Sequence, residues 1–195
     1  MSGTRAFIAI DIDGSLWKPI STVSAELAAL GCTVSTSKSN LHITLFFFES
    51  ISDSEIKLIE AAMRIAKCNE FLLTLKGVDF FMHKNDPLVA YIGIKHSIPL
   101  LSLYRTLNEA LSVAGVATEK KPFSPHLTVG RVRRGSNPVK REALIAMRSK
   151  YAASEFGSFI CRSMVLKRRV LSEHGPVYSD IYKIDFSKMS AKPKT

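Results

Sequence analysis

Asn40-Leu41-His42-Ile43-Thr44-Leu45 is a short apolar stretch interrupted by a histidine and a threonine, and Ser124-Pro125-His126-Leu127-Thr128-Val129 repeats it 84 residues later. The side chains of a β-strand alternate between its two faces. A strand at each position would therefore bury its apolar residues and present histidine and threonine together on the other face. Two matched strands of this kind predict two equivalent halves that share one site.

The elements expected around the two motifs follow one order. The first half is expected to contain a strand over 5–12, a helix ending near Gly31, the His42 strand, a helix over 52–67 that starts with the capping box Ser52-Asp53-Ser54-Glu55, and a strand over 71–80. The second half is expected to contain a strand over 88–94, a helix from Ser97 to Gly115, the His126 strand, a helix over 137–151, and strands over 159–171 and 177–186.

This order predicts an α+β fold with two lobes related by a pseudo-twofold axis. We expect two antiparallel sheets, flanked by helices, around a central cleft into which each lobe contributes one histidine strand. A single bilobal domain would span residues 1–189, and the polar tail over 190–195 is expected to be disordered.

Composition narrows the class of protein. The 195 residues are 46% hydrophobic, which is enough for a core, and no stretch approaches the roughly 20 apolar residues of a membrane span. The N-terminus shows no cleavable signal, so a cytoplasmic protein is expected. The three cysteines show no Cys-x-x-Cys spacing, which predicts reduced, structural residues. With 27 basic against 17 acidic residues the net charge is +10, a balance that favours polyanions such as RNA.

Two imidazoles that face one another suit a reaction in which one group takes a proton while the other gives one, such as cleavage of a phosphodiester. The unperturbed pKa of histidine, about 6.5, makes both protonation states accessible at physiological pH. Thr44 and Thr128 would lie beside the imidazoles as donors to phosphate oxygens. A single strand histidine is more often structural, but a matched pair in basic surroundings favours function. No acidic or cysteine cluster accompanies either motif, so we expect no metal and no cofactor.

The chain resembles the two-histidine phosphoesterases, and among them the RNA 2′,3′-cyclic phosphodiesterases, also called 2′-5′ RNA ligases. The resemblance rests on both motifs and on three further stretches, which are the opening 5–11, the flanks of the second motif over 121–131, and the closing 165–168 with 172–176 and Tyr178. It implies a basic cleft that opens a terminal 2′,3′-cyclic phosphate to a 2′-phosphomonoester without a required metal.

The resemblance also implies roles for individual residues. His42 would protonate the leaving 3′-oxygen and His126 would deprotonate the attacking water, although the sequence does not decide which histidine is acid and which is base. Thr44, Thr128 and Arg131 would bind the phosphate. In the ligase direction the two histidines would exchange roles. Lys121, in the basic segment before His126, is a candidate RNA contact.

One departure from the family pattern follows the first motif, where Phe46-Phe47-Phe48-Glu49 replaces the more usual basic residue and Phe-Leu-Gly. Strict alternation puts Phe46 and Phe48 on the face of His42, where a ring could stack on the terminal base, and core packing is the equally weighted alternative.

Arg131 lies an odd number of residues from His126 and would face away from it in a regular strand. A bulge at Gly130 would turn Arg131 inward, and pseudo-symmetry then turns Phe47 inward as well.

The sequence thus predicts a cytoplasmic, metal-independent RNA 2′,3′-cyclic 3′-phosphodiesterase that acts as a monomer, away from membranes, on RNA ends such as tRNA fragments or on cyclic nucleotides. Two other interpretations stay open. The same site could catalyse the reverse reaction as a 2′-5′ RNA ligase, or the protein could be an RNA-end-binding module without catalysis.

Overall fold

The structure is a computed structural model that describes residues 3–34, 38–83, 86–118, 121–132, 141–172 and 175–188. It contains four α-helices, two short 3-10 helices and nine strands in the described residues. The helical elements are η1 (Gly14–Leu16), α1 (Trp17–Ala29), η2 (Lys38–Asn40), α2 (Asp53–Ile65), α3 (Ile98–Val113) and α4 (Arg141–Tyr151). The strands are β1 (Thr4–Asp11), β2 (Thr33–Val34), β3 (His42–Ile51), β4 (Phe71–His83), β5 (Asp86–Ile94), β6 (His126–Arg131), β7 (Glu155–Cys161), β8 (Ser163–Ser172) and β9 (Gly175–Asp185).

One antiparallel sheet runs in the order β7-β4-β5-β6-β3-β1-β8-β9, and β2 joins the outer part of β6. The two histidine strands, β3 and β6, are neighbours at its centre, where Ile43 pairs with Leu127. The two expected sheets are therefore joined at this contact. The α+β class and the antiparallel pairing are confirmed.

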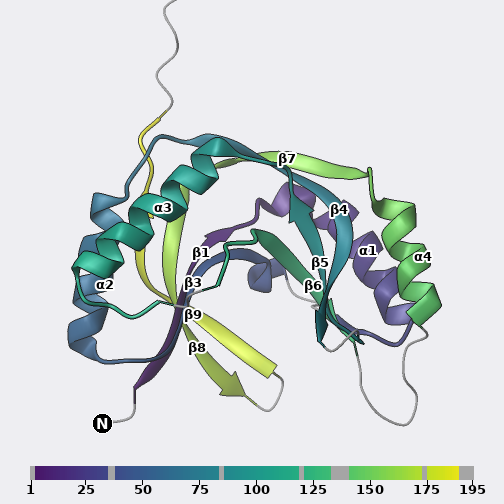
Figure 1. Ribbon diagram of the computed structural model, residues 1–195, viewed down its shortest axis with the longest axis horizontal. Helices are drawn as coiled ribbons and strands as arrows, with labels where there is room; N and C mark the ends of the chain where they lie inside the picture. The colour runs from purple at the N-terminus through teal and green to yellow at the C-terminus, as the bar shows by residue number, and fades with distance from the viewer. Residues whose placement is uncertain are drawn as a thin grey trace, which may run out of the picture.

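The helices divide between the two halves of the sheet. Figure 1 shows α2 and α3 beside β3, β1, β8 and β9, and α1 and α4 beside β6, β5 and β4. Each half of the sheet is thus covered by one helix from each repeat. The strands are exchanged between the repeats as well. β4, the last strand of the first repeat, pairs with β5 of the second, and β8 of the second repeat pairs with β1 of the first.

Local sequence signals fix the starts of α2 and α3. Ser52 accepts the backbone N–H of Glu55 while the Glu55 carboxylate accepts the backbone N–H of Ser52, which completes the expected capping box. Ser97 caps α3 in the same way through the backbone N–H of Leu100. Apolar side chains at helical spacing behind each cap are buried against the sheet, among them Ile59 and Leu107 with no exposed surface.

The final strands differ from expectation. The single strand expected over 159–171 is wrong, because the chain leaves the sheet at Arg162, which separates β7 from β8. β7 pairs with β4 at one edge and β8 pairs with β1 in the other half, so the two segments are far apart in the sheet despite being adjacent in sequence.

Two other expectations fall on residues outside the described ranges. These are the start of the helix, at 137–140, and the tail over 190–195.

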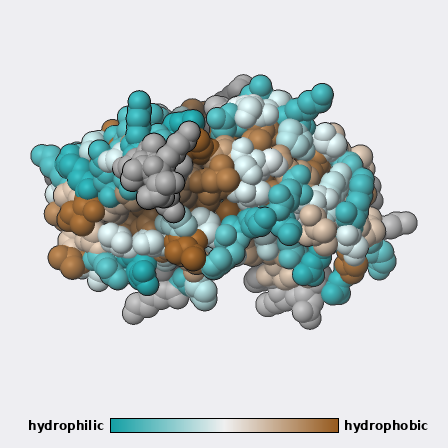
Figure 2. Space-filling view, turned by 90° about the horizontal axis from the view of Figure 1, so that it is seen from above, coloured by the Kyte–Doolittle hydropathy of each residue, from teal (hydrophilic) through white to brown (hydrophobic). Residues whose placement is uncertain are grey.

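The described helices include none that is long and apolar enough to cross a membrane. Figure 2 shows that hydrophilic side chains cover much of the face seen from above, with hydrophobic ones in separate groups among them.

Candidate active site

The four polar residues of the two motifs meet where β3 and β6 pair. In an antiparallel pair, the residues on either side of the Ile43–Leu127 contact are cross-strand neighbours, so His42 faces Thr128 and Thr44 faces His126. Ile43 and Leu127 have no exposed surface, whereas the four polar side chains are partly exposed. Each histidine therefore lies across from the threonine of the other motif, on the face of the sheet opposite the core.

A one-residue bulge follows each motif, at equivalent positions. On β3 the bulged residue is Leu45, because Ala9 pairs with Thr44 and the next residue back, Ile8, pairs with Phe46. On β6 it is Val129, because Tyr91 pairs with Thr128 while Ala90 pairs with Gly130. Each bulge shifts the alternation of side chains by one residue.

The bulge on β6 places Arg131 opposite Val89, on the same face as Tyr91 and His126. The bulge on β3 places Phe47 opposite Phe7, whose ring packs against that of His42. The expectation that strict alternation puts Phe46 and Phe48 beside His42 is wrong. Both are about 95% buried on the core side, and the Phe46 ring stacks on Tyr104 of α3 at 4.6 Å.

His42 lies in a largely apolar setting. Its ring centroid is 4.7 Å from that of Phe7 and 5.3 Å from that of Tyr178, which meets it edge-on. Among the described residues, Nδ1 of His42 is buried and has no hydrogen-bond partner of good geometry. Burial is the main cause that lowers the pKa of His42 to about 4; the backbone of Asn40 opposes the shift, and the charges of Lys167 and His126 add to it. His42 is therefore neutral at pH 7 in the free protein.

His126 is held differently. Its Nδ1 lies 2.7 Å from the carbonyl oxygen of Ser124, which can only accept, so Nδ1 carries the proton and donates it. Tyr91 and Phe81 pack against the ring with centroids 5.4 and 4.6 Å away. Burial lowers the pKa of His126, and the Ser124 carbonyl partly opposes this effect. The ring is thus fixed with Nε2 as the free acceptor.

A buried lysine completes the His42 side. Lys167 of β8 lies opposite Phe7 and is about 6% exposed. Its Nζ is 3.1 Å from Asp11 Oδ2 and 2.8 Å from Asp180 Oδ1. Burial alone would lower the pKa of Lys167, but hydrogen bonds to Asp180 and Asp11 more than offset it, so the pKa lies above its usual value. Lys167 is a fixed positive charge near His42.

A polar hollow of about 300 Å³ adjoins the His126 side. It is lined by Lys76, Gly77, Val78, Asp79, Tyr91, Gly93, Arg148 and Ala152. Tyr91 and Gly93 connect it with the histidine, since Tyr91 packs on the His126 ring and Gly93 is the cross-strand neighbour of His126.

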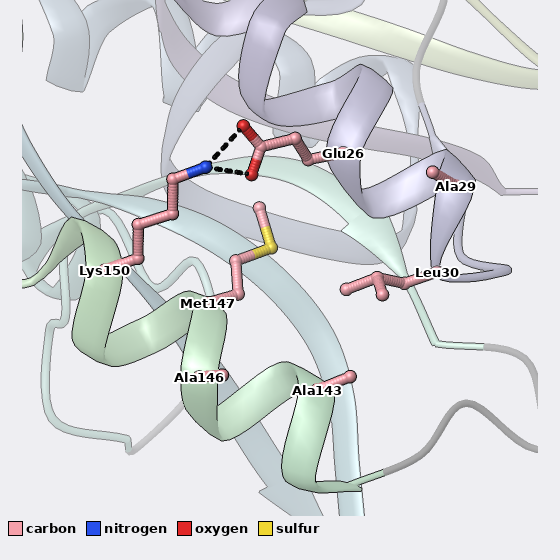
Figure 3. Close-up of a pocket in the computed structure, with 7 residues that line it drawn as sticks. All are labelled: Glu26, Ala29, Leu30, Ala143, Ala146, Met147 and Lys150. Atoms are coloured by element: carbon pink, nitrogen blue, oxygen red, sulfur yellow. Dashed lines mark hydrogen bonds and ion pairs between the residues drawn. The ribbon is translucent and has the colours of Figure 1, made fainter.

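A second hollow, of about 340 Å³, lies between α1 and α4, and Figure 3 shows it bordered by Leu30, Met147 and three alanines, with the Glu26–Lys150 ion pair at one end. None of the expected site residues lines this hollow, so we assign it no part in the chemistry.

The described ranges hold no group of three or more histidine, cysteine or acidic residues placed to bind a metal ion. Cys32, Cys68 and Cys161 are free, as expected.

Sequence reasoning missed several neighbours of the two histidines. Lys167 and Tyr178 stand within the stretches that carry the family resemblance, but their sequence positions gave no sign that they converge on His42. Phe7 and Tyr91 resemble ordinary strand residues. Lys121, the candidate RNA contact, is exposed in the segment before β6.

The chain is similar to known proteins over most of its length. Residues 12–170 match the family model of the 2′-5′ RNA ligase superfamily. An RNA 2′,3′-cyclic phosphodiesterase of Archaeoglobus fulgidus is 31% identical over 91% of this chain and 97% of its own length. The RNA 2′,3′-cyclic phosphodiesterase of Thermotoga maritima is 31% identical over 93% of this chain and 95% of its own length.

Solved structures share the fold. The TT0787 protein of Thermus thermophilus superposes with a TM-score of 0.76, with 20% identity and coverage of 95% of this chain and 100% of that one. Apo LigT of E. coli superposes with a TM-score of 0.72, with 20% identity and coverage of 96% of this chain and 99% of that one. The chain belongs to the 2′-5′ RNA ligase superfamily, as its paired histidine motifs indicated.

Proposed function

We propose that this protein hydrolyses 2′,3′-cyclic phosphate ends of RNA to 2′-phosphomonoesters, with His42 and His126 as a general acid–base pair. The observation that carries the proposal is the pairing of β3 with β6, which sets each histidine across from the threonine of the other motif. Relatives that match nearly the whole chain are named RNA 2′,3′-cyclic phosphodiesterases, which supports the same reaction.

The environment of His126 favours it as the base. Because Nδ1–H is donated to the Ser124 carbonyl, the lone pair of Nε2 is free to take a proton from water. The water oxygen then bonds to phosphorus while the bond from phosphorus to O3′ breaks. His42 gives its proton to O3′, and the phosphate stays on O2′.

His42 must be protonated to act as the acid, although its pKa in the free protein is about 4. A bound phosphate diester carries a negative charge next to the ring, and such a charge raises the pKa of an imidazole. The proposal therefore includes uptake of a proton by His42 when the cyclic phosphate binds.

The remaining roles follow from position. Thr44 and Thr128 would donate to the non-bridging oxygens, where negative charge grows in the transition state. Arg131, turned toward the cleft face by the β6 bulge, would contact the phosphate from the same side. Phe47 shares the face of His42 through the matching bulge, so it is the phenylalanine of the 46–48 run that would contact the bound RNA. Lys121 and the net charge of +10 would attract the RNA chain.

The test is incubation of a short RNA carrying a 2′,3′-cyclic phosphate with the protein in EDTA, followed by identification of the product. Accumulation of the 2′-phosphate is expected. A requirement for added metal would overturn the metal-independent mechanism. Binding without turnover would favour an RNA-end-binding module, and joining of a 5′-hydroxyl RNA in preference to hydrolysis would favour the ligase direction.

A further inference from the structure

We propose that the polar hollow beside His126 is a subsite for the nucleobase of the nucleotide that carries the cyclic phosphate, and that Asp79 and Arg148 make it prefer guanine. This inference rests on the proposed function, because it takes the phosphate to lie between the two histidines.

The hollow continues directly from the catalytic pair. The cross-strand neighbour of His126 on β5 is Gly93, so no side chain stands on β5 directly opposite the imidazole. A Cβ at Gly93 would lie 2.8 Å from the Lys76 carbonyl oxygen, a contact too short for a methyl group. Strands are about 4.8 Å apart, and Asp79 is opposite Tyr91, two residues along β5 from Gly93, so the step from His126 on β6 to Asp79 on β4 is about 12 Å. A nucleoside whose phosphate lies at the histidines can span such a distance.

Tyr91 supplies an aromatic wall. It lies opposite Asp79 and lines the hollow, and its ring is fixed by stacking on Phe81 with centroids 4.4 Å apart. Burial raises the pKa of Tyr91, and the Asp79 charge adds to the effect, so the phenol is neutral at pH 7. A neutral, rigid ring at the side of a hollow is the usual partner for a stacked base.

Asp79 and Arg148 form the far end. Arg148 comes from the last turn of α4, and its Nε lies 3.0 Å from Asp79 Oδ1. The backbone N–H of Phe80 donates to the same oxygen at 2.8 Å. Both contacts reach Oδ1. The carboxylate supplies an acceptor for a ligand, and the terminal nitrogens of Arg148 are donors. The Asp79 and Arg148 side chains are 37% and 62% exposed, so a ligand can reach them.

This pair suits a base better than a phosphate. The carboxylate neutralises the guanidinium and would repel a phosphate at the same place, whereas a base needs both an acceptor and a donor. Guanine offers N1–H and an amino group for a carboxylate, and O6 and N7 for a guanidinium. Lys76 at the edge adds a positive charge that favours nucleic acid in general. The volume of about 300 Å³ falls within the range of small-ligand sites.

The test measures binding of the four nucleoside 2′-monophosphates by calorimetry to wild type, Asp79→Asn and Arg148→Gln. Wild type should bind 2′-GMP most tightly, and each substitution should reduce its advantage by about tenfold, the discrimination typical of one base-edge contact. Arg148→Gln changes an exposed side chain, so it still tests the inference if Asp79→Asn fails to fold. Glu155→Gln is the matched control, since it removes an exposed carboxylate that pairs with Lys95 outside the hollow.

Equal affinity for the four nucleotides, or a guanine preference that both variants keep, would overturn the inference. A preference that emerges only with dinucleotides would also do so, because it would assign the hollow to the upstream residue. Hydrolysis of the four 2′,3′-cyclic mononucleotides separates the two proposals. Turnover without base preference leaves the proposed function and removes the subsite, whereas base-selective binding without turnover does the reverse.

Discussion

The buried, neutral state of His42 makes the stability of the protein depend on pH in a way that one substitution can isolate. The pKa of His42 is about 4 in the folded protein, against about 6.5 for an unperturbed histidine. Between these values the unfolded chain binds the proton and the folded one does not, so the free energy of unfolding falls as pH decreases through this window. The shift of about 2.5 units corresponds to a loss of about 3 kcal/mol between pH 7 and pH 4.

The substitution His42→Gln removes the titrating group and so should remove this part of the slope. Urea unfolding followed by circular dichroism at half-unit steps from pH 4 to pH 7 measures it for wild type and variant. The difference between the two stability curves should change by about 3 kcal/mol across the range, whatever constant offset the substitution adds. His96→Gln, which removes an exposed imidazole, is the control. Parallel curves for wild type and His42→Gln would refute the account of His42 as a buried, neutral imidazole.

Three further predictions concern the groups around the histidines. Lys167→Met should raise the pKa of His42, because it removes a buried positive charge, and the change can be followed by NMR titration of the ring; an unchanged pKa would show that Lys167 does not act on His42. Thr44→Val or Thr128→Val should lower kcat by about 10²-fold with little change in KM, as expected for donors that act on developing charge, whereas a change in KM alone would assign the hydroxyls to ground-state binding. Arg131→Gln should weaken RNA binding and reduce its salt dependence by about one phosphate contact, and a slope equal to that of wild type would place Arg131 outside the phosphate site.

The sequence was sufficient to predict much of the fold because local signals and long-range pattern agreed. The repeated His-x-Thr strands, the capping box at Ser52 and the serine cap at Ser97 all specify elements that the structure contains. The break at Arg162 was missed because the residues on both sides of it are equally strand-like. What separates β7 from β8 is their partners, β4 and β1, and pairing is a property of the whole sheet.

Details of strand pairing that local sequence does not reveal also limited the prediction of the site. Alternation correctly paired His42 with Thr44 but failed at Phe46, because the bulge at Leu45 reverses the faces. The equivalence of the two repeats was the better guide. It linked Phe47 to Arg131, and the bulges at Leu45 and Val129 turn both residues to the cleft face.

The neighbours that tune the histidines could not be predicted at all. Lys167 reaches Asp11 and Asp180, which are distant in sequence, only once β8 lies between β1 and β9.

The central claim is that His42 and His126 act together as acid and base, and a double-mutant comparison of single-turnover rates on a 2′,3′-cyclic phosphate RNA in EDTA tests it most directly. His42→Ala and His126→Ala should each lower the rate by at least 10²-fold, and the double variant should be little slower than either, because the two groups serve one step. Folding of each variant is checked by circular dichroism. If either single variant keeps near wild-type turnover, or if the two losses simply multiply, the paired mechanism is contradicted.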